Sequence, residues 1–213
     1  MNETQYLTIL LIPTIALLIV ISQIFKIIKR NVVGKVGERR IVRYLKQTGV
    51  KGYILTNLYI PYRKSLTEVD AVFISKKGIF VIESKNYKGR IYGDVNKRSW
   101  IQILQANNRY YFYNPIKQNA SHTKAISKIL NIPDARFKPI VIFGNQARLN
   151  VNSKCVINVK DLTNYIKSQP TTIYNKKKLK EIYKTLKPYK KVSLRDKIKH
   201  RKHVNMKKRQ NNR

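Results

Sequence analysis

Hydrophobic residues at the start of the chain form one continuous run. Residues 6–25 carry no charged side chain. Twenty helical residues span about 30 Å, the thickness of the hydrocarbon layer of a membrane. Pro13 lies inside this run, and membrane helices tolerate proline better than soluble helices do. The run therefore predicts one transmembrane helix.

The charges on either side of this run predict its orientation. Glu3 precedes it, and Lys26, Lys29 and Arg30 follow it. A cleaved signal peptide has the opposite order, with positive charge before the apolar run. Because positive flanks stay on the cytoplasmic side, we expect a single-pass protein of the cell membrane with the rest of the chain in the cytoplasm.

After residue 30, shorter stretches alternate between helical and strand periodicity. Apolar positions three and four apart predict a helix from Gly34 to about Gly49, and Pro115 suits the first turn of a later helix. Asp161 suits the cap of another helix. The predicted helices are 34–49, 115–130, 161–168 and 177–186, and the predicted strands are 53–60, 67–75, 78–84, 89–95, 138–143 and 155–159. We expect the aromatic stretch between residues 95 and 115 to be irregular.

This order of elements predicts an α/β fold, with a mixed sheet flanked by helices. We expect an anchor and basic juxtamembrane stretch at 1–30, one domain at 31–186, and a tail at 187–213. The tail contains twelve Lys or Arg and one acid, with almost no apolar periodicity, which predicts disorder.

The overall charge suggests polyanionic partners. Forty-five Lys and Arg face ten Asp and Glu, which gives a formal net charge of +35. Nucleic acid, DNA or RNA, and anionic lipid headgroups beside the basic flanks both suit such a surface. A genome biased toward lysine and asparagine codons explains the lysines, but not the scarcity of acids.

Some of the few acids fall within apolar strands, where a carboxylate is costly unless a cation pairs with it. Strand alternation places Glu68 and Asp70 on one face of their strand and Glu83 and Lys85 on one face of the next. If residues 76–77 form a two-residue turn, Asp70 lies opposite Glu83, and Glu68 opposite Lys85. A bulge at the turn shifts this register by one residue.

Two interpretations of this cluster stay open on the residues alone. In the first, Lys85 neutralises the carboxylates as a buried ion pair. In the second, Asp70 and Glu83 hold a divalent metal, Mg²⁺ or Mn²⁺, because Mg²⁺ takes one or two carboxylates and completes its shell with water and substrate phosphate. Lys85 then acts on the attacking water or on the charge of the transition state.

Four motifs in order resemble the NERD family, the nuclease-related domain. They are Gly34-x-x-Gly37-Glu38, Thr67-Glu68-Val69-Asp70, Val81-Ile82-Glu83-Ser84-Lys85-Asn86-Tyr87-Lys88-Gly89, and Asn114-Pro115-x-x-Gln118, spread over residues 34–122. The resemblance implies a PD-(D/E)xK restriction-endonuclease-like core, in which an acid on one strand and an acid-x-Lys on the next bind metal. It therefore favours a catalytic role for Asp70, Glu83 and Lys85.

The same resemblance implies further site residues. Glu38 supplies another acid near the metal, and Gln118 faces the site from its helix. His122 lies one turn after Gln118 on the same helix face. Glu38 is equally a first-turn acid favoured by the helix dipole, and Gln118 and His122 suit a solvated helix face. Ala71 stands where many family members have histidine.

Two other features have less weight. Cys155 cannot form an internal disulfide, and its apolar neighbours predict a structural residue. Arg109-Tyr-Tyr-Phe-Tyr113 interleaves a base with aromatics, which suits either core packing or a platform that stacks single-stranded bases. The leading hypothesis is a metal-dependent nuclease at the membrane, and the alternatives are a non-catalytic nucleic-acid tether and a protein scaffold.

Overall fold

The computed structural model describes residues 3–63, 65–105, 108–171 and 174–190, apart from the side chains of residues 3–10, 12 and 26–38. The chain divides into two compact units, residues 1–37 and 38–213. The predicted tail lies outside the described residues from 191 onward. Its first residues, Lys187–Lys190, form the short helix η4, in which Tyr189 packs against the core.

The first unit is the N-terminal part of helix α1, which runs from Glu3 to Gln47. Among the side chains described in this unit, the leucine, isoleucine, valine and phenylalanine residues between 11 and 25 are mostly exposed. Among the residues that the structure describes, no helix meets the length and hydropathy needed to cross a membrane. Part of the predicted span, residues 6–10 and 12, lies outside the described side chains.

The predicted span at 6–25 and the predicted helix at 34–49 belong to one continuous helix, because α1 runs through Gly34 and Gly37. A glycine inside a helix costs about 1 kcal/mol relative to alanine, which does not suffice to end a helix. Gly34-x-x-Gly37 is therefore a helical segment rather than a loop.

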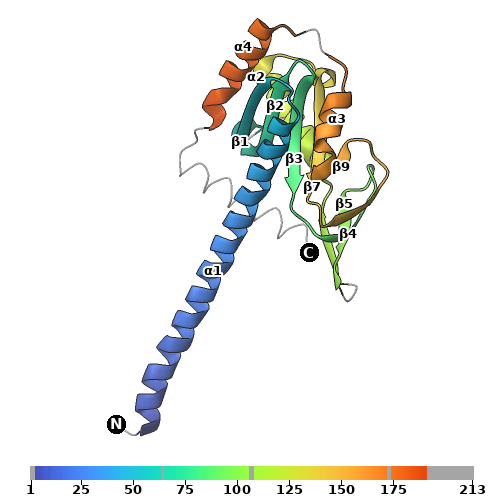
Figure 1. The fold of residues 1–213 in the computed structure, drawn as a ribbon. Coiled ribbons are helices and arrows are strands. Elements are labelled where there is room, and N and C mark those ends of the chain that lie inside the picture. Colours follow the sequence, from blue (N-terminus) through green and yellow to red (C-terminus); the bar gives the residue numbers. More distant parts are fainter. Residues whose placement is uncertain (1–2, 64, 106–107, 172–173, 191–213) are drawn as a thin grey trace. The chain divides into compact units, whose positions relative to one another are not determined.

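The second unit is built on two mixed sheets, as shown in Figure 1. The large sheet has the order β1-β2-β3-β7-β9, and the small sheet has the order β6-β5-β4-β8. The strands are β1 (Gly52–Tyr62), β2 (Ser65–Ser75), β3 (Gly78–Lys85), β4 (Gly89–Gly93), β5 (Ser99–Ile103), β6 (Arg109–Tyr113), β7 (Phe137–Phe143), β8 (Ala147–Val151) and β9 (Val156–Asn158). The predicted α/β class with helices flanking mixed sheets is confirmed.

The small sheet interrupts the crossover that joins β3 to β7. Strands β1, β2 and β3 are antiparallel neighbours, whereas β3, β7 and β9 are parallel. Parallel strands need a long connection, and here that connection contains β4, β5, β6 and helix α2 (Pro115–Leu130). The prediction that residues 95–115 are irregular is thus wrong, since this segment contains β5 and β6.

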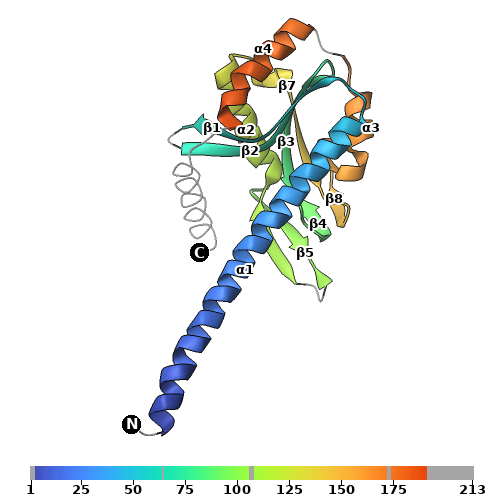
Figure 2. The same cartoon turned by 60° about the vertical axis from the view of Figure 1, so that its left-hand side comes forward.

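Helices cover both faces of the large sheet. Helices α2 and α4 (Lys176–Leu186) pack on one face, with Ile126 and Ile182 in the same cluster as Val72 and Val81. Helix α3 (Leu162–Ser168) and the end of α1 in the second unit cover the other face. Figure 2 shows α3 and α4 on opposite sides of the sheet. The short helices η2 (Asp134–Arg136) and η3 (Val159–Asp161) lie in connections.

One irregularity in β1 changes which side chains face α2. Leu55 and Leu58 belong to the same core cluster although they are three residues apart, and so do Val69 and Val72 on β2. Strict alternation places residues three apart on opposite faces. Asn57 lies between the two leucines with a φ of 57°, so the alternation of both strands reverses at this point.

Candidate active site

The hairpin of β2 and β3 determines the geometry of the candidate site. Lys76 and Lys77 form a two-residue turn, and the register runs from Ser75–Gly78 to Ala71–Ile82. Gly78 has a φ of 138°, a conformation that L side chains rarely adopt. The predicted turn and register are confirmed, and the alternative register with a bulge is not adopted.

Asp70 is the first residue of β2 beyond this register. Its Oδ2 accepts a hydrogen bond of 2.6 Å from the backbone N–H of Ser84. The Asp70 side chain therefore accepts from the Ser84 N–H at the point where the backbone pairing of β2 with β3 ends. This bond holds the half-buried Asp70 carboxylate beside Glu83, as the sequence predicts.

Glu83 is the centre of a buried polar network. Only 2% of its side chain is exposed. Lys85 Nζ lies 2.6 Å from Glu83 Oε1, and His122 Nε2 lies 3.0 Å from Glu83 Oε2. Both carboxylate oxygens thus have a partner, one from the same strand and one from α2.

Gln118 and Thr67 extend this network. Lys85 Nζ donates to Gln118 Oε1 at 3.0 Å, and Gln118 Nε2 lies 3.4 Å from His122 Nε2. Thr67 Oγ1 lies 2.8 Å from His122 Nδ1, so both ring nitrogens of His122 have a partner. The helix face of Gln118 and His122 is therefore part of the site, and the alternative of a solvated face is wrong for His122, which is buried.

Two asparagines position α2 over the sheet. The side-chain Oδ1 of Asn114 accepts from the N–H groups of Ile116 and Lys117, and its side-chain Nδ2 donates to the carbonyls of Asp94, Val95 and Lys97. The buried Asn119 amide donates to the carbonyls of Val81 and Ile140, on adjacent strands. The Asn114 bonds fix the start of α2, and the Asn119 bonds fix its second turn against the sheet. Gln118 and His122 lie on either side of Asn119 in the sequence and therefore point at β3.

Burial and neighbouring charge change the pKa of each ionisable group at the centre. Burial, together with the charge of Glu83, raises the pKa of Asp70 well above its usual value. Burial also acts to raise the pKa of Glu83, but Lys85 and His122 outweigh it and hold that pKa below its usual value. Burial acts to lower the pKa of Lys85, but Glu83 outweighs it and raises that pKa. Glu83 and Lys85 are a charged pair, and Asp70 is the carboxylate whose charge is least compensated.

Glu68 does not lie where it was predicted. Because the alternation reverses near Asn57, Glu68 lies on the face opposite to Thr67 and Val69, away from α2. It pairs with Tyr59 of β1 and accepts a hydrogen bond of 2.8 Å from the Tyr59 hydroxyl. The prediction that Glu68 opposes Lys85 is therefore wrong. Glu38 belongs to α1, but its side chain lies outside the described residues.

The carboxylate oxygens at the site suit a hard cation, although they are few. Asp70 and Glu83 are two adjacent carboxylates, and the raised pKa of Asp70 indicates negative charge that a cation would compensate. Among the described residues, no three His, Cys, Asp or Glu side chains form a ready ligand set. Magnesium sites fit this pattern, since Mg²⁺ needs few protein ligands. A metal bound through Glu83 would share its carboxylate oxygens with Lys85 and His122, since each oxygen has two lone pairs and one of these two residues as a partner.

The comparisons with known proteins agree with this architecture. The family model described as the nuclease-related domain matches residues 33–144, which include β1 to β7, α2 and every described member of the Glu83 network. The chain belongs to the nuclease-related domain family. It is also 30% identical to an uncharacterized protein of Bacillus anthracis over 188 residues, which are 83% of this chain and 87% of that protein. No solved structure matches the chain significantly.

Sequence reasoning missed three residues of this nuclease-related domain that hold the site together. Thr67 stands in one of the four motifs without an assigned role, and Asn119 has no local pattern that marks it, because their partners lie 55 and 38 residues away in the chain. Asn114 had a signal, since an asparagine before a proline at the first helical position is a helix cap. That signal predicts the capping bonds, but not the three bonds to the connection between β4 and β5.

Proposed function

We propose that this protein is a metal-dependent nuclease of the PD-(D/E)xK type that hydrolyses phosphodiester bonds, with DNA as the favoured substrate and RNA as the second. One observation carries the proposal. Strands β2 and β3 bring Asp70 beside Glu83 and Lys85 on the face that α2 covers, where the Glu83–Lys85 pair is buried and charged. The family implies this constellation for an acid on one strand and an acid-x-Lys on the next.

The residues of the site divide into two roles. Lys85 remains protonated next to Glu83 and is 17% exposed, so its ammonium can reach the charge that develops on a scissile phosphate. Gln118 and His122 position Lys85 and Glu83 from α2. Asp70 and Glu83 would hold Mg²⁺ or Mn²⁺, which would supply Lewis-acid activation of the phosphate and of a bound water.

A cleavage assay with matched variants tests this proposal. The full-length protein in a non-ionic detergent is incubated with DNA or RNA and Mg²⁺ or Mn²⁺. We expect Asp70→Asn and Lys85→Ala each to lose at least about 100-fold in cleavage rate, since removing one transition-state donor costs that much in other enzymes. Lys180→Ala, at an exposed cation on α4 and outside the site, is the control and keeps the rate. Absence of cleavage of either nucleic acid with either metal contradicts the proposal.

One observation favours a second candidate function, a non-catalytic nucleic-acid tether. Both Glu83 oxygens already have protein partners, so the charge of Glu83 is compensated without a metal. Ala71 also departs from the family pattern next to Asp70. If the tether is correct, the protein binds nucleic acid with a steep salt dependence and never cleaves it.

We also propose that residues 6–25 anchor the nuclease-related domain to the cell membrane, with the domain in the cytoplasm. The described side chains of residues 11–25 are predominantly apolar and exposed, which is costly in water and favourable in lipid. Leu18→Arg with Val20→Arg places two charges in this run, each at a cost of about 3 kcal/mol for insertion. We expect the unmodified chain in carbonate-washed membranes and this variant outside them, whereas Leu18→Phe stays with the membrane. Equal partition of all three contradicts the anchor.

A further inference from the structure

The small sheet has one face that the core does not use. Its inner face carries Ile91, Trp100 and Phe112, which pack with Phe143 of the large sheet. Ile91 pairs with Gln102, and Gln102 pairs with Tyr110, so these residues share the inner face. Side chains one residue along each strand therefore point to the opposite side, which we call the outer face.

The strand register arranges the outer face in two rows. In the first row, Arg109, Ile103, Arg90 and Arg148 are successive cross-strand partners over β6, β5, β4 and β8. In the second row, Tyr111, Ile101, Tyr92 and Asn150 are partners in the same order. Three arginines thus lie beside two tyrosines, with isoleucines in the centre.

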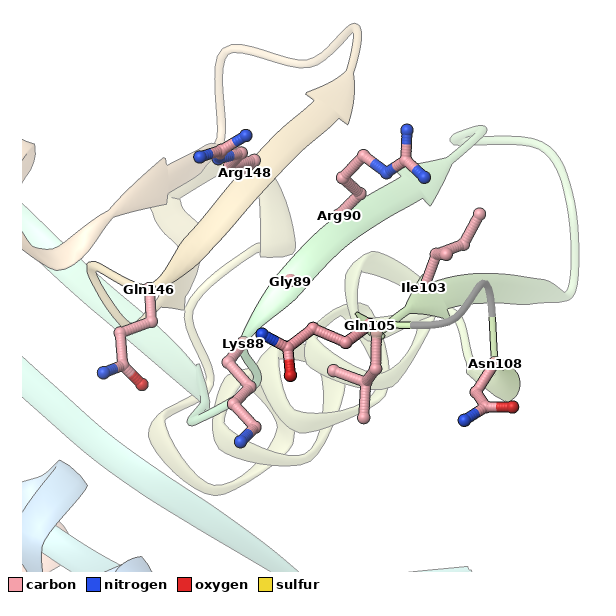
Figure 3. Close-up of a pocket in the computed structure, with 9 residues that line it drawn as sticks. Lys88, Gly89, Arg90, Ile103, Gln105, Asn108, Gln146 and Arg148 are labelled. Atoms are coloured by element: carbon pink, nitrogen blue, oxygen red, sulfur yellow. The ribbon is translucent and has the colours of Figure 1, made fainter.

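These side chains are accessible. Tyr111 is 68% exposed, and Arg90, Arg109 and Arg148 are exposed. Arg90, Ile103 and Arg148 also line a pocket of about 710 Å³ together with Lys88, Gln105 and Gln146. Figure 3 shows Arg90, Ile103 and Arg148 projecting to the same side of the sheet. Within the described residues, this pocket has three cationic side chains and no acid in its lining.

We infer that the outer face binds single-stranded nucleic acid, with bases stacked on Tyr92 and Tyr111 and phosphates paired with Arg90, Arg109 and Arg148. The exposed ring of Tyr111 and the half-buried ring of Tyr92 suit unstacked bases, which every sequence offers, and arginines suit the backbone. A duplex keeps its bases stacked on each other, so it can use the arginines but not the tyrosines. The net charge of +35 makes a polyanion the matching partner.

This inference goes beyond the proposed nuclease activity, because binding at the outer face does not require cleavage. The two can therefore fail separately. Binding is measured in EDTA, where metal-dependent cleavage cannot occur. If the unmodified protein cleaves no nucleic acid but the outer-face variants weaken its binding as expected, only the nuclease proposal is contradicted. If the unmodified protein cleaves nucleic acid but the outer-face variants bind it unchanged, only this inference is contradicted.

Fluorescence anisotropy tests the inference with the full-length protein in detergent. The probes are a labelled oligothymidine of about 20 nucleotides, which exceeds the site size of one such platform, and a blunt duplex of equal length. We expect Tyr92→Ala with Tyr111→Ala to weaken oligothymidine binding about five- to 100-fold and to leave duplex binding within about twofold. Tyr111→Phe, which keeps the ring, retains binding. Arg148→Ala weakens both probes and reduces the slope of log K against log salt by about 0.7 for the single strand.

Two controls match these variants. Tyr110 is 52% exposed on the same strand but on the inner side of the register, so Tyr110→Ala is expected to bind normally. Lys180 is an exposed cation on α4, and Lys180→Ala controls for the loss of one charge. The inference is overturned if the tyrosine variants bind oligothymidine normally, or if they lose single-strand and duplex binding equally. Photocrosslinking of a 5-iodouracil oligonucleotide gives a test without substitution: crosslinks at Tyr92 or Tyr111 support the inference, and crosslinks only elsewhere overturn it.

Discussion

The large sheet buries Glu83 under α2, whereas the small sheet exposes three arginines and Tyr111 on its outer face. In the large sheet, Glu83 has partners on both oxygens, and its pKa and those of Asp70 and Lys85 are displaced by burial and by one another. In the small sheet, Tyr111 projects from a short strand into open space. Coupled, buried groups suit chemistry, and separate, exposed groups suit binding. The two sheets thus offer distinct sites in one nuclease-related domain.

If this contrast is correct, the largest stability effect within the Glu83 network comes from removing Lys85. Lys85→Met leaves the Glu83 carboxylate buried with only His122 as a partner, and breaking a buried pair in this way costs about 3–5 kcal/mol of unfolding free energy. Urea unfolding followed by circular dichroism measures the loss. The exposed Lys88→Met is expected to change stability by less than about 0.5 kcal/mol.

A second substitution tests whether this loss comes from the charge. In Glu83→Gln with Lys85→Met the buried carboxylate is gone, so the double variant is expected to be more stable than Lys85→Met alone. A double variant that is less stable than either single one shows that Lys85 contributes packing rather than charge compensation.

His122 is expected to have the next largest effect. His122→Ala removes a partner from Glu83 and from Thr67, and an unsatisfied buried polar group costs about 1–3 kcal/mol. Lys124→Ala, exposed two residues further along α2, is the control and stays near the unmodified stability. The same urea measurement applies. Equal stability of His122→Ala and Lys124→Ala would show that His122 does not contribute to the stability of the network.

Asp70 is expected to act in the opposite direction. Asp70→Asn keeps an oxygen for the Ser84 N–H and removes a half-buried carboxylate whose charge is poorly compensated, so it is expected to raise the unfolding free energy at neutral pH by about 1 kcal/mol while it abolishes cleavage. Asp134→Asn, at an exposed acid, is the control and leaves both unchanged. A destabilised Asp70→Asn shows that the carboxylate is compensated in the folded protein.

The pH dependence of stability sharpens the same point. The pKa of Asp70 is raised above its usual 3.8, so the folded protein binds this proton more tightly, and stability falls as pH rises through the raised pKa. The pKa of Glu83 is held below its usual 4.5, so its contribution is present above that value and is lost as pH falls through the lowered pKa. Stability is therefore expected to peak in mild acid, and Asp70→Asn to lack the decline toward neutral pH. Mg²⁺ is expected to stabilise the unmodified protein at neutral pH, but not Asp70→Asn.

The sequence predicted the large sheet better than the small one for a physical reason. Long apolar alternation and a two-residue turn leave one register for β2 and β3, and this register brings Asp70 to Glu83. Strands β5 and β6 have five residues each, and much of their polar and aromatic surface faces solvent. Without a continuous apolar face, their periodicity is indistinguishable from that of an irregular loop.

Within the candidate site, the limits of prediction lie in single backbone angles and long-range bonds. The positive φ of Asn57 reverses the alternation and removes Glu68 from the site, and nothing in Leu55-Thr56-Asn57-Leu58 requires that conformation. His122 was identified only by its spacing from Gln118, because its partners Thr67 and Glu83 come from two other strands. Local patterns identify which residues share an element, and the packing of elements decides which of them meet.

The smallest expected effect is the sharpest test of the outer face. Tyr111→Ala is expected to change the unfolding free energy by less than about 0.5 kcal/mol, because a side chain that is mostly exposed loses little packing when it is removed. Trp100→Ala, on the inner face of the neighbouring strand, is expected to cost about 3–5 kcal/mol, since its ring is fully buried against Phe112 and Phe143. Urea unfolding compares the two. A loss at Tyr111 approaching that at Trp100 means that the outer face packs in the folded protein, and a surface already covered cannot receive bases.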